Sequence, residues 1–383
     1  MAAPKLKTLE EQVGQLLIMG FDGTEPSAHL RSLLTALQPG GVVLFARNIA
    51  DPRQTWELLR ECQKCVRTPL FCCVDMEGGT VDRLKNVIAP APSANDVFQT
   101  GNRKVFRLHG RMIGGEVRAL GFSVDFAPTC DLALEPARKV LTSRVVSDDP
   151  KQVTTYAREF LRGLRDCHVL GCGKHFPGLG GGALDTHKNI APIDRTFKQL
   201  WNEDIVPYRE LHGQMPFIMV SHAAYPAVTK DEAPASLSKK WITDILRNKL
   251  GYKGVIVSDD LEMGAAIAGA ASGRSTDDEA AMIGEASLRF LKAGGDMYLV
   301  SHRAEAVMSG FHAVLSEAER SRRFQAKVAE SVDRVLALKK RAALDKRRCP
   351  APTQKTVDKL RRDLWQFSEE LRLAHLVRQE ANA

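Results

Sequence analysis

The stretch KGVIVSDDLEM, residues 253–263, decides the fold, because it runs from β-branched apolar residues directly into carboxylates. Such a run is typical of a buried strand with a polar C-terminal end. The same pattern recurs along the chain, and it predicts eight strands at 13–21, 40–47, 69–77, 122–132, 168–176, 216–225, 253–263 and 295–302. Amphipathic segments with helical spacing separate these runs. The alternation predicts a (β/α)₈ barrel of the TIM type with a C-terminal helical extension, and an open doubly wound sheet is the alternative.

Polar residues gather at the C-terminal end of each predicted strand. The transitions are CCVDMEGG, APTCD, CGKHFPG, MVSHAAYP, VSDDLEM and LVSH. In a barrel these ends converge on one mouth, where barrel enzymes place their active sites. A binding protein could use the same arrangement, but so many ionisable groups at one mouth favour catalysis.

Composition and charge exclude several classes of protein. The 383 residues are 44% hydrophobic and 26% charged, which is typical of a globular protein, and no apolar run is long enough to span a membrane. The eight cysteines do not resemble a disulfide framework, so we predict reduced thiols and a cytoplasmic location. The net charge of +8 comes from scattered basic residues, and neither a nucleic-acid partner nor a membrane partner is predicted.

After His302 the strand pattern gives way to helices, so we expect a catalytic barrel over 1–340 and a linker with a helix over 341–383. In the last helix an apolar seam recurs at 3–4 spacing through Val357, Leu360, Leu364, Phe367, Leu371 and Ala374. The seam predicts a helix folded back on the barrel, or else a contact with a second subunit. A monomer and a homodimer therefore both stay open.

Asp259 and Asp260 are the first candidates for a reacting carboxylate. Alternation along the strand puts Val255, Val257 and Asp259 on one face and Asp260 on the other, which favours Asp259. An Asp-Asp pair can instead cap the following helix. The residues alone do not decide between a reacting carboxylate and a helix cap.

Two further motifs predict substrate contacts at the mouth. In DMEGGTVDRL, Asp75 and Arg83 can bind sugar hydroxyls, a carboxylate or a phosphate, or can form a structural salt bridge with each other. In KHFPG, Lys174 and His175 occupy consecutive strand-end positions.

The glycine-rich segment 180–182 leads to Asp185 and His187. A histidine two residues after an aspartate indicates an imidazole oriented by a carboxylate, acting as a general acid/base. The glycines predict a loop that brings His187 to a bound substrate.

Together these motifs resemble glycoside hydrolase family 3, and within it the single-barrel bacterial β-N-acetylglucosaminidases of peptidoglycan recycling. The resemblance runs from about Leu9 to about Lys339 through EEQVGQLLIMGF, PGGVVLFARN, VDMEGG, FAPTCDL, GKHFPG, DTH, PASLS, GVIVSDDLEM and AGGDM. It implies a retaining, exo-acting enzyme without cofactor or metal, which removes non-reducing terminal GlcNAc from GlcNAc-anhydro-muropeptides.

The resemblance also implies roles for individual residues. Asp259 takes the position of the nucleophile, and His187, oriented by Asp185, takes that of the acid/base. The sugar-binding positions fall on Asp75, Arg83, Arg144, Lys174 and His175. Arg144 rests on the resemblance alone.

The chain departs from the family pattern at four positions, which carry Leu179 for His, Thr80 for Arg, Thr186 for Ser and Ser143 for Asp. These changes concern substrate contact and the loop rather than the reacting groups.

Three alternatives follow from the same residues. A neutral imidazole base does not repel an incoming anion, so phosphorolysis of the same linkage is the first. A metal-dependent hydrolase with His175, His187, Asp185 and Asp259 as ligands is the second. A sugar-binding barrel without turnover is the third.

Overall fold

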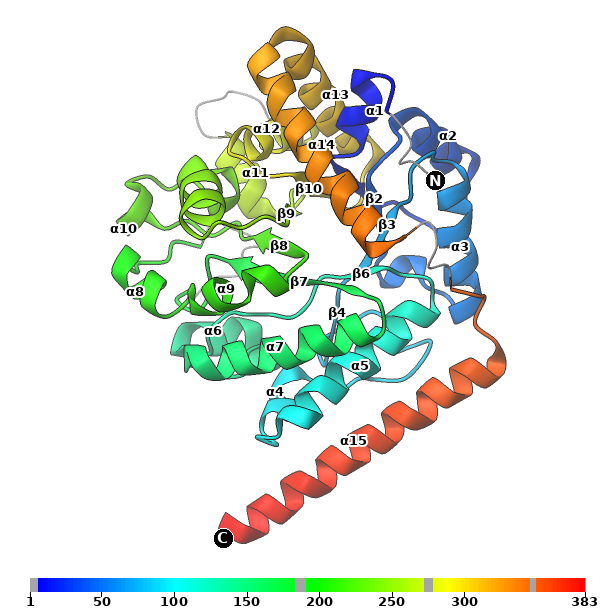
Figure 1. Cartoon of the computed structure of the whole chain (residues 1–383), viewed down its shortest axis with the longest axis vertical. Coiled ribbons are helices and arrows are strands. Elements are labelled where there is room, and N and C mark those ends of the chain that lie inside the picture. The colour runs from blue at the N-terminus through cyan, green and yellow to red at the C-terminus, as the bar shows by residue number, and fades with distance from the viewer. Residues whose placement is uncertain (1–5, 183–190, 272–277, 345–348, 383) are drawn as a thin grey trace.

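The computed structural model describes residues 6–182, 191–271, 278–344 and 349–382, and its centre is a closed parallel barrel (Figure 1). The strand order is β1-β10-β9-β8-β7-β6-β3-β2, and β1 pairs with both β10 and β2. The barrel strands are β1 (Leu17–Met19), β2 (Gly41–Val43), β3 (Phe71–Val74), β6 (Val124–Asp125), β7 (Leu170–Phe176), β8 (Phe217–Val220), β9 (Val255–Asp260) and β10 (Met297–Val300). The predicted (β/α)₈ barrel is confirmed, and each predicted strand contains one of these.

The strands are shorter than the apolar runs that predicted them. The predicted strand 13–21 starts too early, because Leu9–Gly14 form helix α1 and the strand begins only at Leu17. Thr8 caps that helix by accepting a hydrogen bond from the backbone N–H of Glu11. Val13 is apolar because the helix buries it against the barrel, which a strand pattern cannot distinguish.

Helices surround the barrel, and a side-chain oxygen caps the N-terminus of many of them, as Ser27, Asp51 and Asp149 do. The α-helices are α1, α2 (Ala28–Leu37), α3 (Pro52–Lys64), α4 (Ala94–Phe98), α5 (Arg103–Ala119), α6 (Glu135–Leu141), α7 (Pro150–Asp166), α8 (Phe197–Asn202), α9 (Val206–Leu211), α10 (Pro226–Thr229), α11 (Gly264–Ala271), α12 (Glu279–Lys292), α13 (Ala304–Arg320), α14 (Arg322–Ala342) and α15 (Gln354–Asn382). The 3₁₀ segments are η1 (Ala46–Asn48), η2 (Thr142–Arg144), η3 (His212–Gln214) and η4 (Ala235–Leu237), and η5 (Lys240–Lys249) is π-helical.

The barrel interior is packed with side chains rather than open. Phe71 of β3 and Phe217 of β8 meet edge to face inside it, with ring centroids 5.1 Å apart. The chemistry of the barrel is therefore confined to the mouth.

A small antiparallel hairpin of β4 (Met76–Gly78) and β5 (Val81–Asp82) follows β3 at the mouth. Gly78 has φ +83°, and a Cβ there would lie 2.1 Å from the carbonyl oxygen of Pro92. Only glycine fits this turn, which fixes Glu77 immediately above the end of β3.

The last helix, α15, runs along the outside of α5 and ends at the C-terminus (Figure 1). Val357, Leu364, Phe367 and Leu371 of the predicted seam are buried, and Leu360 is half-buried. Ala374 is exposed, so the seam was wrong at its last position. The division of the chain into two domains at residue 340 stays a prediction. None of the described helices is both long and apolar enough to cross a membrane.

Candidate active site

A cleft of about 190 Å³ opens at the C-terminal ends of the strands. Six of the eight predicted site residues line it, namely Asp75, Arg83, Arg144, Lys174, His175 and Asp259. They come from β7, β9, η2 and the segments after β3 and β5, so the barrel topology brings together positions 75 to 259 of the chain. Asp185 and His187 lie outside the described residues.

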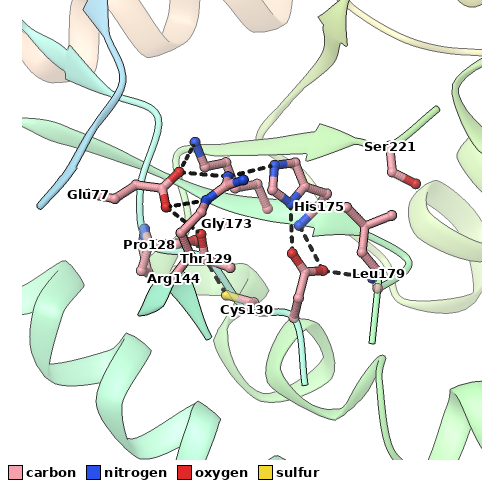
Figure 2. Close-up of polar contacts among 12 residues, drawn as sticks. Glu77, Pro128, Thr129, Cys130, Arg144, Gly173, His175, Leu179 and Ser221 are labelled. Carbon is pink, nitrogen blue, oxygen red and sulfur yellow. Dashed lines mark hydrogen bonds and ion pairs between the residues drawn. The ribbon is translucent and has the colours of Figure 1, made fainter. Parts of the chain in front are cut away.

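Glu77 is the centre of the charged cluster in this cleft (Figure 2). Its carboxylate accepts two hydrogen bonds from Arg144, one from Nε and one from Nη2, each of 2.9 Å. Lys174 Nζ lies 2.6 Å from Glu77 Oε1 and 2.8 Å from Asp75 Oδ1. Thr129 Oγ1 donates a further bond of 3.0 Å to Glu77 Oε2. One buried carboxylate thus fixes two of the cationic side chains that line the cleft, Arg144 and Lys174.

The charge states of this cluster follow from its geometry. Burial alone raises the pKa of Glu77, but the charges and hydrogen bonds of Arg144 and Lys174 outweigh it and hold that pKa well below its usual range. Burial lowers the pKa of Lys174, and attraction to Asp75 and Glu77 reverses this and raises it. Glu77, Arg144 and Lys174 are therefore ionised at neutral pH.

Glu77 was not among the predicted site residues. The signal for it was present in VDMEGG, since Glu77 is two residues after Asp75 and a strand continued that far would point both side chains to one side.

His175 is oriented by Asp131. Its Nδ1 lies 2.7 Å from Asp131 Oδ2, and Asp131 Oδ1 accepts the backbone N–H groups of His175 at 3.3 Å and Leu179 at 2.8 Å. His175 Nε2 then points toward Arg144 Nη2, 3.5 Å away (Figure 2). The carboxylate fixes the ring and leaves Nε2 at the cleft.

We expect Asp131→Asn to lower kcat/KM by about 10- to 100-fold, the effect of losing one charge-assisted hydrogen bond. The Asn Oδ1 can still accept both backbone bonds, so thermal unfolding should change little. Steady-state kinetics and a thermal melt on the same preparation test this. A variant with wild-type kcat/KM would show that Asp131 does not orient His175 for function.

The structure separates Asp259 from Asp260. Asp259 lines the cleft, and its Oδ1 accepts the backbone N–H of Asp260 at 2.9 Å. Burial raises the pKa of Asp259, but the imidazoles of His175 and His222, that N–H and the charge of Lys174 bring it below its ordinary value. Among the described residues, no cationic side chain forms an ion pair with Asp259. It is an ionised carboxylate facing the cleft.

Asp260 has a local structural role near the start of the following helix, which was the alternative to a reacting carboxylate. Its Oδ1 accepts the N–H of Glu262 at 3.1 Å, which closes the turn before α11, and it does not line the cleft. Burial raises its pKa to about 7.

His222 is a third residue, after Glu77 and Asp131, that was not among the predicted site residues, although MVSHAAYP marked it as a strand-end polar group. Its Nε2 lies 2.9 Å from the carbonyl oxygen of Asp260, so Nε2 carries the proton, and Nδ1 lies 2.7 Å from Ser236 Oγ. Burial lowers its pKa, and the charge of Asp259 opposes this shift. His222 holds the end of β9, and with it Asp259.

Arg83 enters the cleft beside Phe45, with its Cζ 5.6 Å from the ring centroid. Asp75 forms its ion pair with Lys174, and no ion pair between Asp75 and Arg83 occurs among the described residues. The alternative of a salt bridge between Asp75 and Arg83 was therefore wrong. Arg83 Nε is buried and forms no hydrogen bond with any described group. A ligand in the cleft is a natural acceptor for it.

Leu179, one of the departures from the family pattern, packs on a small hydrophobic cluster of Ala133, Ala137, Leu141 and Val145. It also lines the cleft, to which it adds an apolar surface. Thr80 is exposed at the hairpin turn, and Ser143 is half-buried beside Gly79.

Within the described parts of the chain, no group of three or more His, Cys, Asp or Glu side chains is placed to hold a metal ion. Of the four ligands considered for a metal, Asp185 and His187 lie outside those parts.

Comparisons with known proteins identify the family of this barrel. The family described as "Glycosyl hydrolase family 3 N terminal domain" matches residues 8–338. A Beta-hexosaminidase of Pseudomonas aeruginosa is 36% identical over 296 residues, which cover 76% of this chain and 84% of that protein. One of Xanthomonas campestris pv. campestris is 36% identical over 310 residues, which cover 78% and 88%.

Solved structures give the same answer. The family 3 β-N-acetylglucosaminidase from Paenibacillus sp. str. FPU-7 superposes with a TM-score of 0.86 at 32% identity, over 95% of this chain and 69% of that one. The match to the family spans the whole barrel with its cleft. The chain therefore belongs to glycosyl hydrolase family 3 and is a glycoside hydrolase.

Proposed function

We propose that the chain is a retaining, exo-acting β-N-acetylglucosaminidase that removes non-reducing terminal GlcNAc from peptidoglycan fragments, the GlcNAc-anhydro-muropeptides. The observation that carries the proposal is that an ionised Asp259 lines one cleft with the cluster of Asp75, Glu77, Arg144 and Lys174. The names of the relatives, which are hexosaminidases and N-acetylglucosaminidases, support the sugar. The muropeptide aglycone rests on the sequence resemblance.

In the proposed first step Asp259 attacks the anomeric carbon, while protonated His187 gives its proton to the leaving oxygen. In the second step neutral His187 removes a proton from water, which attacks the glycosyl-Asp259 ester and releases the sugar. Asp185 orients His187 in this proposal. An imidazole with a pKa near 6.5 suits both steps at neutral pH.

The ionised cluster has a matching role in sugar binding. Asp75 can accept hydrogen bonds from sugar hydroxyls, and Arg83, Arg144, Lys174 and His175 can donate them. Because Glu77 holds two of the donors before substrate arrives, little rotamer freedom is lost on binding.

We also propose a cytoplasmic location. All eight cysteines are free thiols, which supports a reducing compartment.

The test is release of p-nitrophenol from p-nitrophenyl-β-GlcNAc by wild type and His187→Ala, with p-nitrophenyl-β-glucoside as the control substrate. We expect wild-type turnover of the GlcNAc substrate and a loss of about 10²–10⁴-fold in kcat for His187→Ala. Undiminished activity in His187→Ala would contradict the acid/base assignment.

Two additions separate the alternatives. A phosphate arm analysed for GlcNAc 1-phosphate decides between hydrolysis and phosphorolysis, and an EDTA arm tests for a required metal. We expect free GlcNAc as the product and no effect of EDTA. Binding of GlcNAc without turnover would indicate the sugar-binding barrel instead.

A further inference from the structure

The C-terminal helix α15 lies beyond the family match, which ends at residue 338. It nevertheless runs along the outside of α5 (Figure 1), and its His375 contacts the backbone of Asp96 in α4. Its role is not accounted for by the chemistry described so far.

Polar contacts join α15 to the backbone of the segment 84–100. Arg361 bridges two carbonyl oxygens of that segment, from Nε to Ile88 and from Nη2 to Val87, each at 3.0 Å. Further along the helix His375 Nε2 lies 3.0 Å from the carbonyl oxygen of Asp96, and Arg378 donates to that of Thr100. The helix thus holds this segment at several separate points.

The same segment supports the hairpin that carries Glu77. Asp82 accepts the N–H groups of Leu84 and Ala91 at 2.9 Å each, and the carbonyl oxygen of Ala91 accepts the N–H of Gly79 at 2.9 Å. Leu84 and Ala91 therefore fix the turn of the hairpin next to Glu77. These two residues lie on either side of Val87 and Ile88, whose carbonyl oxygens Arg361 binds.

The segment also supports Arg144. Helix α4, within the segment, packs against η2, whose last residue is Arg144. Gly79 lies beside Ser143 of η2, where a Cβ would be 3.3 Å from its Oγ. Both partners of the Glu77–Arg144 pair thus rest on residues 84–100.

Apolar packing anchors α15 in this position. Leu364 and Phe367 are buried, and the Phe367 ring lies 6.2 Å from that of His109 on α5. His109 is in turn fixed by the hydroxyl of Tyr156 on α7, 2.9 Å from its Nδ1. The helix is a braced support rather than a loose extension.

We propose that α15 is a positioning element of the active site, which acts through residues 84–100 to hold Glu77 and Arg144, and that Arg361 is its main positioning residue. The kinetic part of the test rests on the proposed function, whereas the hydrogen-exchange part does not.

The experiment compares Arg361→Ala with Arg362→Ala in the full chain, because Arg362 is exposed on the same helix and carries the same charge. Arg361→Lys keeps the charge but cannot bridge two carbonyls in the same way. We expect Arg361→Ala to raise KM for p-nitrophenyl-β-GlcNAc by about three- to ten-fold with kcat within about two-fold of wild type. Arg361→Lys should fall between, and Arg362→Ala should match wild type.

Amide hydrogen exchange gives the second readout. Peptides covering residues 77–91 should exchange faster in Arg361→Ala than in wild type or Arg362→Ala, because local opening of the hairpin costs less free energy. Peptides from β9 on the opposite side should not change.

Two results would overturn the proposal. One is equal KM and equal exchange in Arg361→Ala and Arg362→Ala. The other is a lower melting temperature for Arg361→Ala with unchanged KM and exchange, which would make α15 a source of stability alone. If wild type itself does not turn over the substrate, the proposed function fails, and the exchange data still decide the role of α15.

Discussion

Asp259→Asn is expected to lower kcat for p-nitrophenyl-β-GlcNAc by on the order of 10⁴-fold or more, as the removal of a nucleophile does in other enzymes. The amide keeps the shape of the side chain and can still accept the N–H of Asp260, but it cannot form the glycosyl ester. Substrate binding by the cluster around Glu77 should persist. Burst and steady-state release of p-nitrophenol measure the loss.

Asp260→Asn is the matched control, one residue away and with the same change of chemistry. Its side chain does not line the cleft and accepts the N–H of Glu262, which an asparagine oxygen can also do. We expect kcat within about three-fold of wild type, since a side chain outside the site has little effect on the transition state. Loss of activity in Asp260→Asn with retention in Asp259→Asn would reverse the assignment of the nucleophile.

The pH dependence of stability provides a check on Asp260. Its pKa is raised to about 7 in the folded protein from an ordinary value of 3.8. Between these values the folded state binds the extra proton, so the contribution of Asp260 to stability falls as pH rises from about 4 to about 7. The free energy of unfolding of Asp260→Asn, measured with denaturant, should not show this fall. The variant should therefore become more stable relative to wild type as pH rises.

Glu77→Gln is expected to have the second-largest effect, on stability and activity together. Removing one partner from a buried ion pair leaves an uncompensated charge, which costs about 3–5 kcal/mol. Here Arg144 and Lys174 both lose charge compensation, although Asp75 still pairs with Lys174. We expect a loss near the lower end of that range, and a fall in kcat/KM on the order of 100-fold because two sugar-binding donors lose their position.

The pH dependence of this loss identifies its cause. The pKa of Glu77 is lowered in the folded state, so its stabilisation is complete above an unfolded pKa of about 4.3 and is lost as pH falls toward the folded value. The difference in unfolding free energy between wild type and Glu77→Gln should be constant above about pH 5.5 and shrink below it. A difference that does not vary with pH would point to packing instead. Urea unfolding from pH 3 to pH 8 measures it.

Apolar patterns were sufficient to predict the barrel, because a strand buried on both faces shows itself as a run of β-branched residues. They did not predict strand bounds. Val13 belongs to a predicted strand but lies in helix α1, and only residues 124–125 of the predicted strand 122–132 form a strand. Apolar residues mark burial, and burial occurs in helices and loops as well as in paired strands. The last helix showed the same limit, since the seam identified its buried face but not the surface on α5 that covers it.

The sequence by itself determined the fold class and the set of polar groups that reach the mouth, including Asp75, Lys174 and Asp259, because each lies near the C-terminal end of its own strand or directly after it. Only the tertiary structure decided which of them are paired, and it added Glu77, Asp131 and His222. Glu77 binds Arg144 and Lys174, 67 and 97 residues further along the chain, and Asp131 binds His175 at a separation of 44. Such pairs leave no local pattern, because the distance between two charges is set by the closure of the barrel rather than by their spacing in the chain.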